Sequence, residues 1–349
     1  MGAGQAGATK LDGLQAGRAV AALMVVAFHA HVFNLPKQMG IEGSWSGFAM
    51  GYAGVEFFFV LSGFIMAYVH GREFGQSDLA GRFLIKRVIR IYPTYWLVLL
   101  PLIAIYLLVP EIGPDRGRDP VAIVTSLFLW PTGDVPVLFA AWTLQHEMLF
   151  YLIFTVFFWS LAGGRAVFVA WTILCIAAIW IDLPHPWSFL FSSYNVLFAL
   201  GILAWRIYPA LNFGTALLAF WLGLGLFLAT GFAEALAGYD WQTDLRTLSY
   251  GIGASGLVAG LAAGALRVPG WLVLLGDASY MIYLAHSPIN ALVAVSLAAI
   301  GAAQFLPAWV ALALIVILAA AVGTALHLWL ERPLIGWLTR RAVPKRPAV

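Results

Sequence analysis

Apolar runs of about 20 residues recur along almost the whole chain, and the charged residues are concentrated between them. A helix needs about 20 mainly apolar residues to cross a bilayer, because about 30 Å of hydrocarbon is traversed at 1.5 Å per residue. The hydrophobic fraction is 62% and the charged fraction is 10%, whereas a soluble domain carries about 25% charged residues. The sequence therefore predicts an all-α, polytopic integral membrane protein that forms a single transmembrane domain over residues 1–349.

Ten segments have the length and composition of transmembrane helices, near residues 14–34, 47–70, 92–109, 138–161, 166–182, 190–208, 211–231, 247–266, 271–300 and 307–330. One further apolar segment, 121–130, is only ten residues long and lies between Pro120 and Pro131. That length favours a re-entrant or interfacial piece over a crossing. From length alone, whether 119–133 crosses stays open.

The loop charges favour ten crossings. With the N-terminus in the cytoplasm, fifteen of the 19 Lys and Arg residues fall on the cytoplasmic side. The four outside are Lys37, Arg116, Arg118 and Arg246. A crossing at 121–130 would move Arg165 and Arg206 outside and break the positive-inside bias. We therefore expect both termini in the cytoplasm, with residues 336–349 as a basic tail.

Ionisable residues inside transmembrane segments are costly, so each is a candidate functional residue. Here they are Arg18, His29, His31, Glu56, Glu147, Asp277, His286 and His327. The structural alternative for each is a polar contact between helices, which is common in membrane proteins.

Arg18 and His29 are separated by eleven positions on the first predicted helix. Eleven steps of about 100° bring them within about 20° of one face, with a rise of about 16 Å. His31 points about 160° away from His29. A histidine supported by a carboxylate is typical of a general base, and Glu56 and Glu147 are expected at a similar depth in the outer half. A proton relay or a structural ion pair would use the same residues.

A basic cluster precedes the third predicted helix: Arg82, Lys86, Arg87 and Arg90. On a helix, Arg87 and Arg90 are neighbours at i and i+3, and guanidinium groups bind phosphates in bidentate fashion. The alternative is a positive-inside anchor in contact with anionic lipid. Charge alone favours the anchor.

A polar stripe lies on the ninth predicted helix, where Ser279, Tyr283 and His286 fall at i, i+4 and i+7. A polar stripe on a helix in lipid is expected to face the interior of the bundle. There it would either line a tunnel or join two helices.

Six phrases, in order and spacing, resemble the acyltransferase-3 family of membrane acyltransferases. They are LDGLQAGRAVAAL (11–23) followed by His29, GVEFFFVLSGF (54–64), FLIKRVIRIYP (83–93), WTLQHEMLFY (142–151), SYMIYLAH (279–286) and ERP (331–333). The resemblance runs from about residue 11 to 335. Members of the family O-acylate carbohydrates such as exopolysaccharide, lipopolysaccharide and peptidoglycan, and this short chain is most similar to the branch that acetylates exopolysaccharide subunits.

The resemblance implies roles for particular residues. The family's arginine, histidine and glutamate fall on Arg18, His29 and Glu147, which are the expected catalytic residues, and its Arg-x-x-Arg falls on Arg87 and Arg90. Lys86 is expected to join these two arginines in acyl-CoA binding. Glu56, Ser279, Tyr283 and His286 are expected to support the site or line a substrate tunnel. Acetyl-CoA or another acyl-CoA is the expected co-substrate, with no permanently bound cofactor. Neither metal-ligand spacing nor a Gly-rich phosphate loop is present, so we expect no metal.

The hypothesis from the sequence is transfer of an acyl group, expected to be acetyl, from cytoplasmic acyl-CoA to a hydroxyl of a cell-surface carbohydrate or its lipid-linked precursor. The expected location is the bacterial cytoplasmic (inner) membrane. The expected partners are membrane lipid, acyl-CoA, the carbohydrate acceptor and polysaccharide-assembly proteins, with no nucleic acid. The main alternative is a proton-coupled secondary transporter or flippase, which also needs intramembrane histidines and carboxylates. A non-catalytic scaffold is a third possibility.

Overall fold

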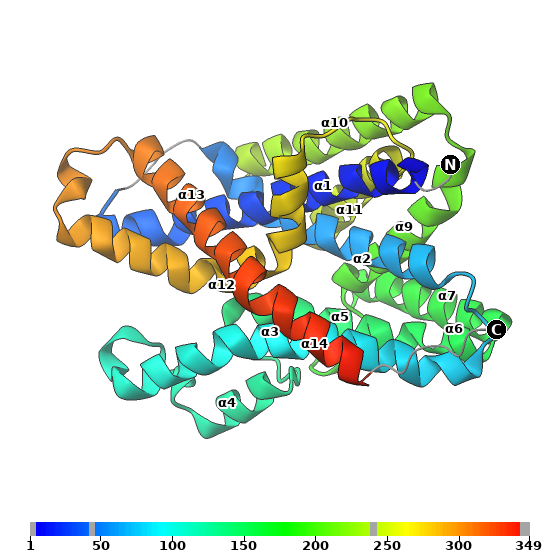
Figure 1. The fold of residues 1–349 in the computed structure, drawn as a ribbon, viewed down its shortest axis with the longest axis horizontal. Coiled ribbons are helices and arrows are strands. Elements are labelled where there is room, and N and C mark those ends of the chain that lie inside the picture. Colours follow the sequence, from blue (N-terminus) through cyan, green and yellow to red (C-terminus); the bar gives the residue numbers. More distant parts are fainter. Residues whose placement is uncertain (1–4, 42–45, 238–242, 343–349) are drawn as a thin grey trace. The chain divides into compact units, whose positions relative to one another are not determined.

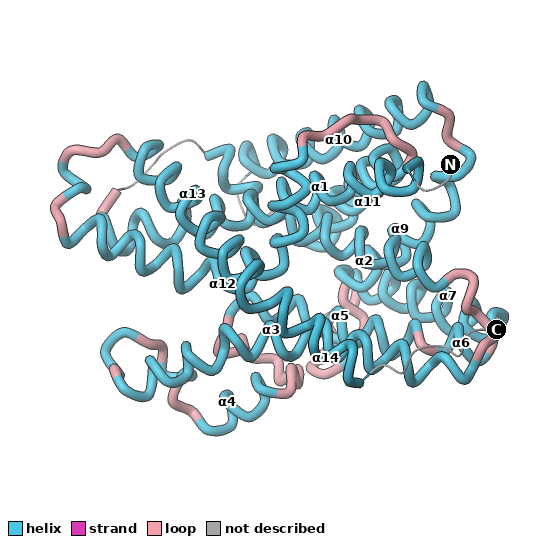
Figure 2. Tube along the Cα trace, viewed as in Figure 1, coloured by secondary structure: helices cyan, strands magenta, loops and turns pink. Residues whose placement is uncertain are grey.

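The computed structural model describes residues 5–41, 46–237 and 243–342. Within these ranges the chain consists of helices joined by loops, with no strand (Figure 2). Eight helical segments of the described chain are long and apolar enough to cross a membrane: Asp12–Met39, Gly47–His70, Ser77–Leu108, Leu161–Trp180, Trp187–Ala210, Phe213–Ala237, Gly270–Ala299 and Ala308–Ala342. This confirms the all-α membrane fold. The number of crossings and the cytoplasmic position of both termini stay predictions.

The chain divides into two compact units. Unit 1 comprises Met1–Val69 and Val196–Ala325, and unit 2 comprises His70–Asn195 and Leu326–Val349. The principal helices of unit 1 are α1 (Gln5–His29), α2 (Gly54–His70), α9 (Ser193–Ile207), α10 (Phe213–Ala237), α11 (Thr243–Ala262), α12 (Gly270–Ala299) and α13 (Ala308–Leu326), as labelled in Figure 1. The single transmembrane domain expected from the sequence stays a prediction.

Helices α1 and α12 of unit 1 pack side by side and run in the same direction. Near their N-terminal ends the backbones touch, since a Cβ atom on Gly276 would lie 2.1 Å from the carbonyl oxygen of Gln15. Further along both helices, Asn290 Nδ2 donates to the carbonyl oxygen of Val26 at 3.1 Å. The core beside them is formed by the fully buried Ala22, Val26, Ala278, Ile282 and Ala319.

Helices α10 and α11 form a close antiparallel pair built on small residues. A Cβ atom on Gly260 would lie 2.7 Å from the carbonyl oxygen of Ala216, so a larger residue there would push the helices apart. At the other end of the pair, Arg246 contacts Glu234. The contact extends over 18 positions of α10, or about 27 Å. Helix α11 therefore follows α10 across nearly the whole hydrocarbon thickness, although its Gly, Ser and Thr residues make it less apolar.

The principal helices of unit 2 are α3 (Ala80–Leu108), α4 (Pro120–Leu127), α5 (Trp142–Phe154), α6 (Val156–Trp159), α7 (Leu161–Ala177), α8 (Trp187–Leu190) and α14 (Arg332–Ala342). Phe83, Phe150, Phe154 and Phe158 are almost fully buried and form its aromatic core. Helix α3 begins twelve residues before the predicted span 92–109, so the basic cluster lies in its first three turns. Because these first turns contain charged residues, the hydropathy pattern did not indicate where the helix begins.

Two other predicted spans differ in the structure. The span at 138–161 is interrupted at Thr155, whose Oγ1 donates to the carbonyl oxygen of Tyr151 at 2.7 Å; this kind of bond bends helices. The last predicted span continues through a π-helical segment, His327–Glu331, into α14. The expected basic tail is therefore helical as far as Ala342, while residues 343–349 lie outside the described part of the chain.

The parallel packing of α1 and α12 limits the number of crossings, because an odd number must separate two parallel transmembrane helices. We predict that six of the intervening crossings are formed by α2, α3, α7, α9, α10 and α11. Helix α4 has eight residues and rises about 12 Å, well short of 30 Å. From Trp142 to Trp159, α5 and α6 rise about 27 Å and are long enough to be the seventh. This parity supports ten crossings.

Candidate active site

In unit 1, the predicted polar residues of α1 and α12 meet where the two helices pack. The Nε of Arg18 donates to the Oγ of Ser279 at 3.1 Å. Ser279 is fully buried, and Tyr283 and His286, which follow it on the same stripe of α12, are also buried. The stripe therefore faces the interior of unit 1. The sequence assigned Arg18 and Ser279 separately, and the structure places them in direct contact.

The second meeting point on these helices is a pair of histidines. The rings of His29 and His286 have centroids 4.6 Å apart and are inclined at 61°. Tyr283 lies beside His286, with ring centroids 5.8 Å apart. His31, in the π-helical segment Ala30–Met39 that follows α1, instead contacts the ring of Phe48. His29 and His31 therefore face different surroundings, as the helical period predicted.

Both histidines are held by backbone carbonyl groups of their own helices. His29 Nδ1 lies 2.9 Å from the carbonyl oxygen of Val25, and His286 Nδ1 lies 2.5 Å from that of Tyr283. A carbonyl oxygen only accepts, so each Nδ1 carries a proton, and when the ring is neutral its lone pair is on Nε2. The Nε2 of His286 is buried without a hydrogen-bond partner in the described chain. This arrangement holds both imidazole rings in a fixed orientation where α1 packs on α12.

Glu56 does not support His29 in this structure. Its side chain is fully buried, and both carboxyl oxygens have no hydrogen-bond partner among the described residues. Its charged neighbours are Arg246 and Glu234. The carbonyl of Val25 orients His29 instead.

Sequence reasoning missed a buried polar network beside Glu56, which consists of Tyr52, Glu234, Arg246 and Tyr250. Arg246 Nη1 donates to Glu234 Oε1 at 2.8 Å, and the hydroxyls of Tyr52 and Tyr250 donate to Glu234 at 2.7 to 2.9 Å. The loop charges predict Arg246 in a loop on the outer side, whereas in the structure it is buried, with only 8% of its surface exposed. The sequence did contain a signal for this pair. Glu234 lies near the end of one apolar run and Arg246 at the start of the next, and a helical hairpin places these two positions side by side.

In unit 2, Arg90 is already engaged by a carboxylate. Its Nη1 lies 3.1 Å from Glu331 Oε1, and His327 Nδ1 donates to Glu331 Oε2 at 2.8 Å. Glu331 is fully buried, whereas the Arg90 side chain is 36% exposed. The glutamate of the ERP phrase thus anchors one side of this guanidinium.

Arg87 and Glu147 are connected through an aromatic residue of unit 2. The Arg87 guanidinium lies 5.7 Å from the ring centroid of Tyr151 and 5.6 Å from that of Phe83. The hydroxyl of Tyr151 donates to Glu147. Lys86 is half-buried one turn before Arg90. Because Glu147 and His29 belong to different units, their pairing stays a prediction.

The two units therefore offer different chemistry. Unit 1 presents neutral imidazoles with Nε2 lone pairs, which are suited to accept a proton. Unit 2 presents guanidinium groups near a buried carboxylate and aromatic rings, which are suited to an anionic ligand. Among the described residues, no group of three or more His, Cys, Asp or Glu side chains is arranged to hold a metal ion.

Comparison with known proteins agrees with a membrane acyltransferase. The family model Acyl_transf_3, described as an acyltransferase domain, matches residues 11–327, nearly the whole chain. The chain belongs to this family of acyltransferases, and it is an integral membrane protein by its apolar helices.

Two rhizobial proteins are similar to this chain. "Exopolysaccharide production protein ExoZ" of Rhizobium meliloti (strain 1021) is 33% identical over 311 residues, which cover 82% of this chain and 90% of that protein. "Protein 2 in picA locus" of Rhizobium radiobacter is 30% identical over 158 residues, which cover 40% of this chain and 76% of that protein. No solved structure matches the chain.

Proposed function

We propose that this protein transfers an acetyl group from acetyl-CoA to a hydroxyl of an exopolysaccharide or of its lipid-linked precursor, in the bacterial cytoplasmic membrane. The family match supports acyl transfer in a membrane. The name of the rhizobial relative supports a role in exopolysaccharide production. The donor and the acceptor are proposed from the chemistry of the two candidate regions.

In this proposal His29 is the general base. The acceptor hydroxyl oxygen attacks the thioester carbonyl carbon, and its proton passes to His29 Nε2. The carbon–sulfur bond then breaks, and the CoA thiolate leaves and takes up a proton. The Nδ1–H donated to Val25 keeps the lone pair on Nε2, and the Nε2 of His286 supplies a second acceptor for the same proton. In a second form of the mechanism, His29 Nε2 carries the acyl group briefly before transfer.

The phosphates of the donor are proposed to bind on α3. Arg87 and Arg90 are spaced at i and i+3, and Lys86 lies beside them. The partly exposed Arg90 keeps further N–H groups beyond the one that contacts Glu331. Arg18 lies about 16 Å from His29 along α1, which is a length suited to the pantetheine arm.

The observation that carries the proposal is the His29–His286 pair, held in one tautomer by two backbone carbonyls. The direct test is consumption of acetyl-CoA by the purified full-length protein with and without carbohydrate acceptor, combined with mass spectrometry of the acceptor for an added acetyl group. Turnover that depends on acceptor supports the proposal. A folded protein that never consumes acetyl-CoA would contradict it.

A proton-coupled transporter remains the second candidate, and the buried ionisable network of Glu56, Glu234 and Arg246 is the observation that favours it. Proteoliposomes distinguish the two functions. Uptake or export driven by a proton gradient in the absence of acetyl-CoA would support the transporter. Acceptor acetylation without a gradient would support the enzyme.

A further inference from the structure

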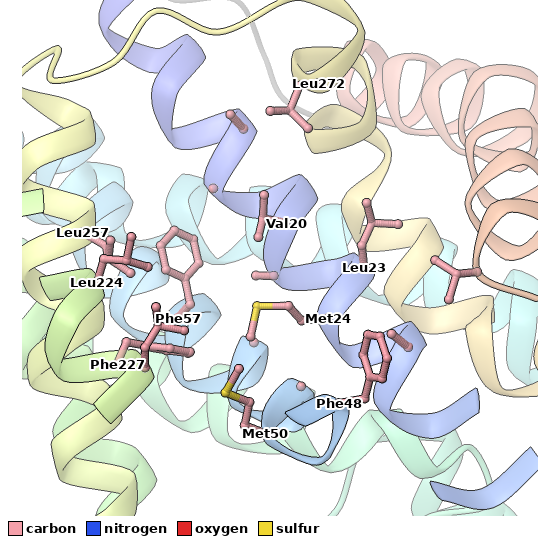
Figure 3. A pocket seen from close by; sticks show the side chains of 18 of the residues that line it. Val20, Leu23, Met24, Phe48, Met50, Phe57, Leu224, Phe227, Leu257 and Leu272 are labelled. Carbon is pink, nitrogen blue, oxygen red and sulfur yellow. The ribbon is translucent and has the colours of Figure 1, made fainter. Parts of the chain in front are cut away.

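One pocket in unit 1 is lined by apolar residues. It has a cavity volume of about 780 Å³ and lies among α1, the segment around Gly47–Gly54, α10, α11, α13 and the residues that lead into α12. Figure 3 shows Val20 and Met24 of α1 on the side of Phe57 and Leu257, while Leu23 lies on the other side of α1. All residues that line it in the described chain are Ala, Gly, Val, Leu, Met, Phe or Trp. A sugar or a chain of waters would find no polar partners here, so the fitting ligand is a hydrocarbon chain.

This pocket is separate from the candidate active site. Most of the α1 residues that line it, among them Val20, Met24 and Ala27, point about 140° to 240° around α1 from Arg18, although Gly17 and Ala21 lie nearer to it. Arg18 and His29 instead face α12. Most of the pocket therefore lies on the side of α1 that faces away from His29.

The length of the pocket matches one leaflet of a bilayer. From Ala16 to Ala27 it follows α1 over eleven residues, or about 16 Å, which is about half of the 30 Å hydrocarbon core. One acyl chain of a phospholipid extends over one leaflet. The pocket therefore suits a single phospholipid chain that enters from one membrane face.

A cationic residue lies in the loop at one end of the pocket. Leu266 and Val268 both line it, and Arg267 between them is exposed. This end lies near the start of α1, because Leu261, a few residues earlier, contacts Gly13 and Gly17. The loop charges predict that this end faces the cytoplasm. A guanidinium there is complementary to the phosphate of a lipid headgroup.

We propose that this pocket binds one acyl chain of an anionic phospholipid from the cytoplasmic leaflet, with the lipid phosphate bound by Arg267. This site is independent of acyl transfer, since neither the donor nor His29 takes part in it. Its tests measure lipid binding, so their outcome does not depend on whether the protein is an acetyltransferase.

The proposed binding of the lipid acyl chain is tested by filling the pocket with a larger side chain in the full-length protein. Native mass spectrometry in detergent measures the affinity for added phosphatidylglycerol. Val20→Trp should lower that affinity roughly tenfold or more. The matched control is Val295→Trp, the same change at an exposed valine of α12 outside the pocket, which should retain wild-type affinity. Ala313→Phe fills the pocket from α13 and serves as a second variant if Val20→Trp does not fold.

The headgroup part is tested by charge removal. Arg267→Gln should abolish the preference for phosphatidylglycerol over phosphatidylcholine, whereas Arg206→Gln, at another exposed arginine of unit 1, should keep it. Equal phosphatidylglycerol binding by folded Val20→Trp, Ala313→Phe and Val295→Trp would overturn the proposal. An unchanged preference in Arg267→Gln would overturn the headgroup assignment. Tighter binding of a polyprenyl phosphate than of phosphatidylglycerol would overturn the choice of occupant.

Discussion

The histidines of unit 1 are oriented by backbone carbonyls, whereas the arginines of unit 2 are held by a carboxylate and by aromatic rings. His29 and His286 donate through Nδ1 and keep Nε2 as an acceptor. Arg90 contacts the buried Glu331, and Arg87 lies against Tyr151. A neutral donor–acceptor bond costs little in an apolar bundle, but a cation needs a counter-charge or a π-face. This difference is why our proposal assigns proton transfer to the first region and anion binding to the second.

The first test measures on which side of the membrane the loops lie, and each reporter should give either a cytoplasmic or an external signal. Reporter proteins fused after Arg165 or Arg206 should read cytoplasmic, and a fusion after Arg118 should read external. The reason is the positive-inside bias together with the parallel packing of α1 and α12. An external signal after Arg165 or Arg206 would exclude the ten-crossing topology.

Loss of the α1 histidine should have the largest effect on rate. His29→Ala should reduce acetyl-CoA turnover by about 10²–10⁴-fold, the usual contribution of a general base. His31→Ala is the matched control, because His31 packs on Phe48 instead of His286. Turnover is measured in detergent and normalised to folded protein. Equal turnover in the two variants would remove the catalytic role of His29.

The ion pair of unit 2 should matter first for stability. Arg90→Ala removes the cation beside the buried Glu331, which still accepts from His327, so the free energy of unfolding should fall by about 1–3 kcal/mol. The double variant Arg90→Met/Glu331→Leu should recover most of that stability but not the affinity for acetyl-CoA. Denaturant unfolding in detergent and a binding titration measure the two effects. A fully active double variant would reduce Arg90 to a structural role.

Arg87 should contribute to binding of the donor. Arg87→Ala should raise the Kd for acetyl-CoA roughly ten- to a hundredfold, since a charge-assisted phosphate contact contributes about 1.5–3 kcal/mol. Arg87→Lys should rescue only part of this, because the guanidinium fork is lost. The exposed Arg341→Ala is the control and should bind normally. Wild-type affinity in Arg87→Ala would favour the lipid-anchor interpretation of the cluster.

The smallest effect is expected at the bond between α1 and α12. Ser279→Ala removes the acceptor of Arg18 Nε, and a single hydrogen bond of this kind contributes about 1 kcal/mol, or roughly fivefold in kcat/KM. Ser296→Ala on the same helix is the control, because Ser296 is exposed and its hydroxyl donates to the carbonyl oxygen of Leu292 in its own helix. A Ser279→Ala variant indistinguishable from Ser296→Ala would show that Arg18 is positioned by other contacts.

The sequence predicted helices well where apolar residues were continuous and less well where they were not. The predicted span 271–300 corresponds closely to Gly270–Ala299. The start of α3 was placed too late, because Arg82, Lys86 and Arg87 interrupt the apolar pattern inside a continuous helix. The break at Thr155 was missed because a side-chain bond to the backbone leaves little trace in hydropathy.

Part of the candidate site was also predictable. The period of 3.6 residues per turn related Arg18 to His29 and Ser279 to His286, since each pair lies on one helix. No periodicity relates His29 to His286, because 257 positions separate them and only the packing of α1 on α12 brings their rings together. The Glu234–Arg246 pair was missed for a similar reason, since it depends on the register of the α10–α11 hairpin.

The sequence by itself determined that this protein lies in lipid and that it belongs to a family of acyltransferases. Its apolar runs require lipid around them, and its six phrases define the acyltransferase family, because both properties lie in the order of residues along the chain. The tertiary structure decided which side chains meet: Arg18 with Ser279, His29 with His286, and Arg90 with Glu331. In lipid the hydrophobic effect does not select helix partners, so close contact of small residues such as Gly276 and a few polar bonds set that register, and these become visible only once the helices are packed.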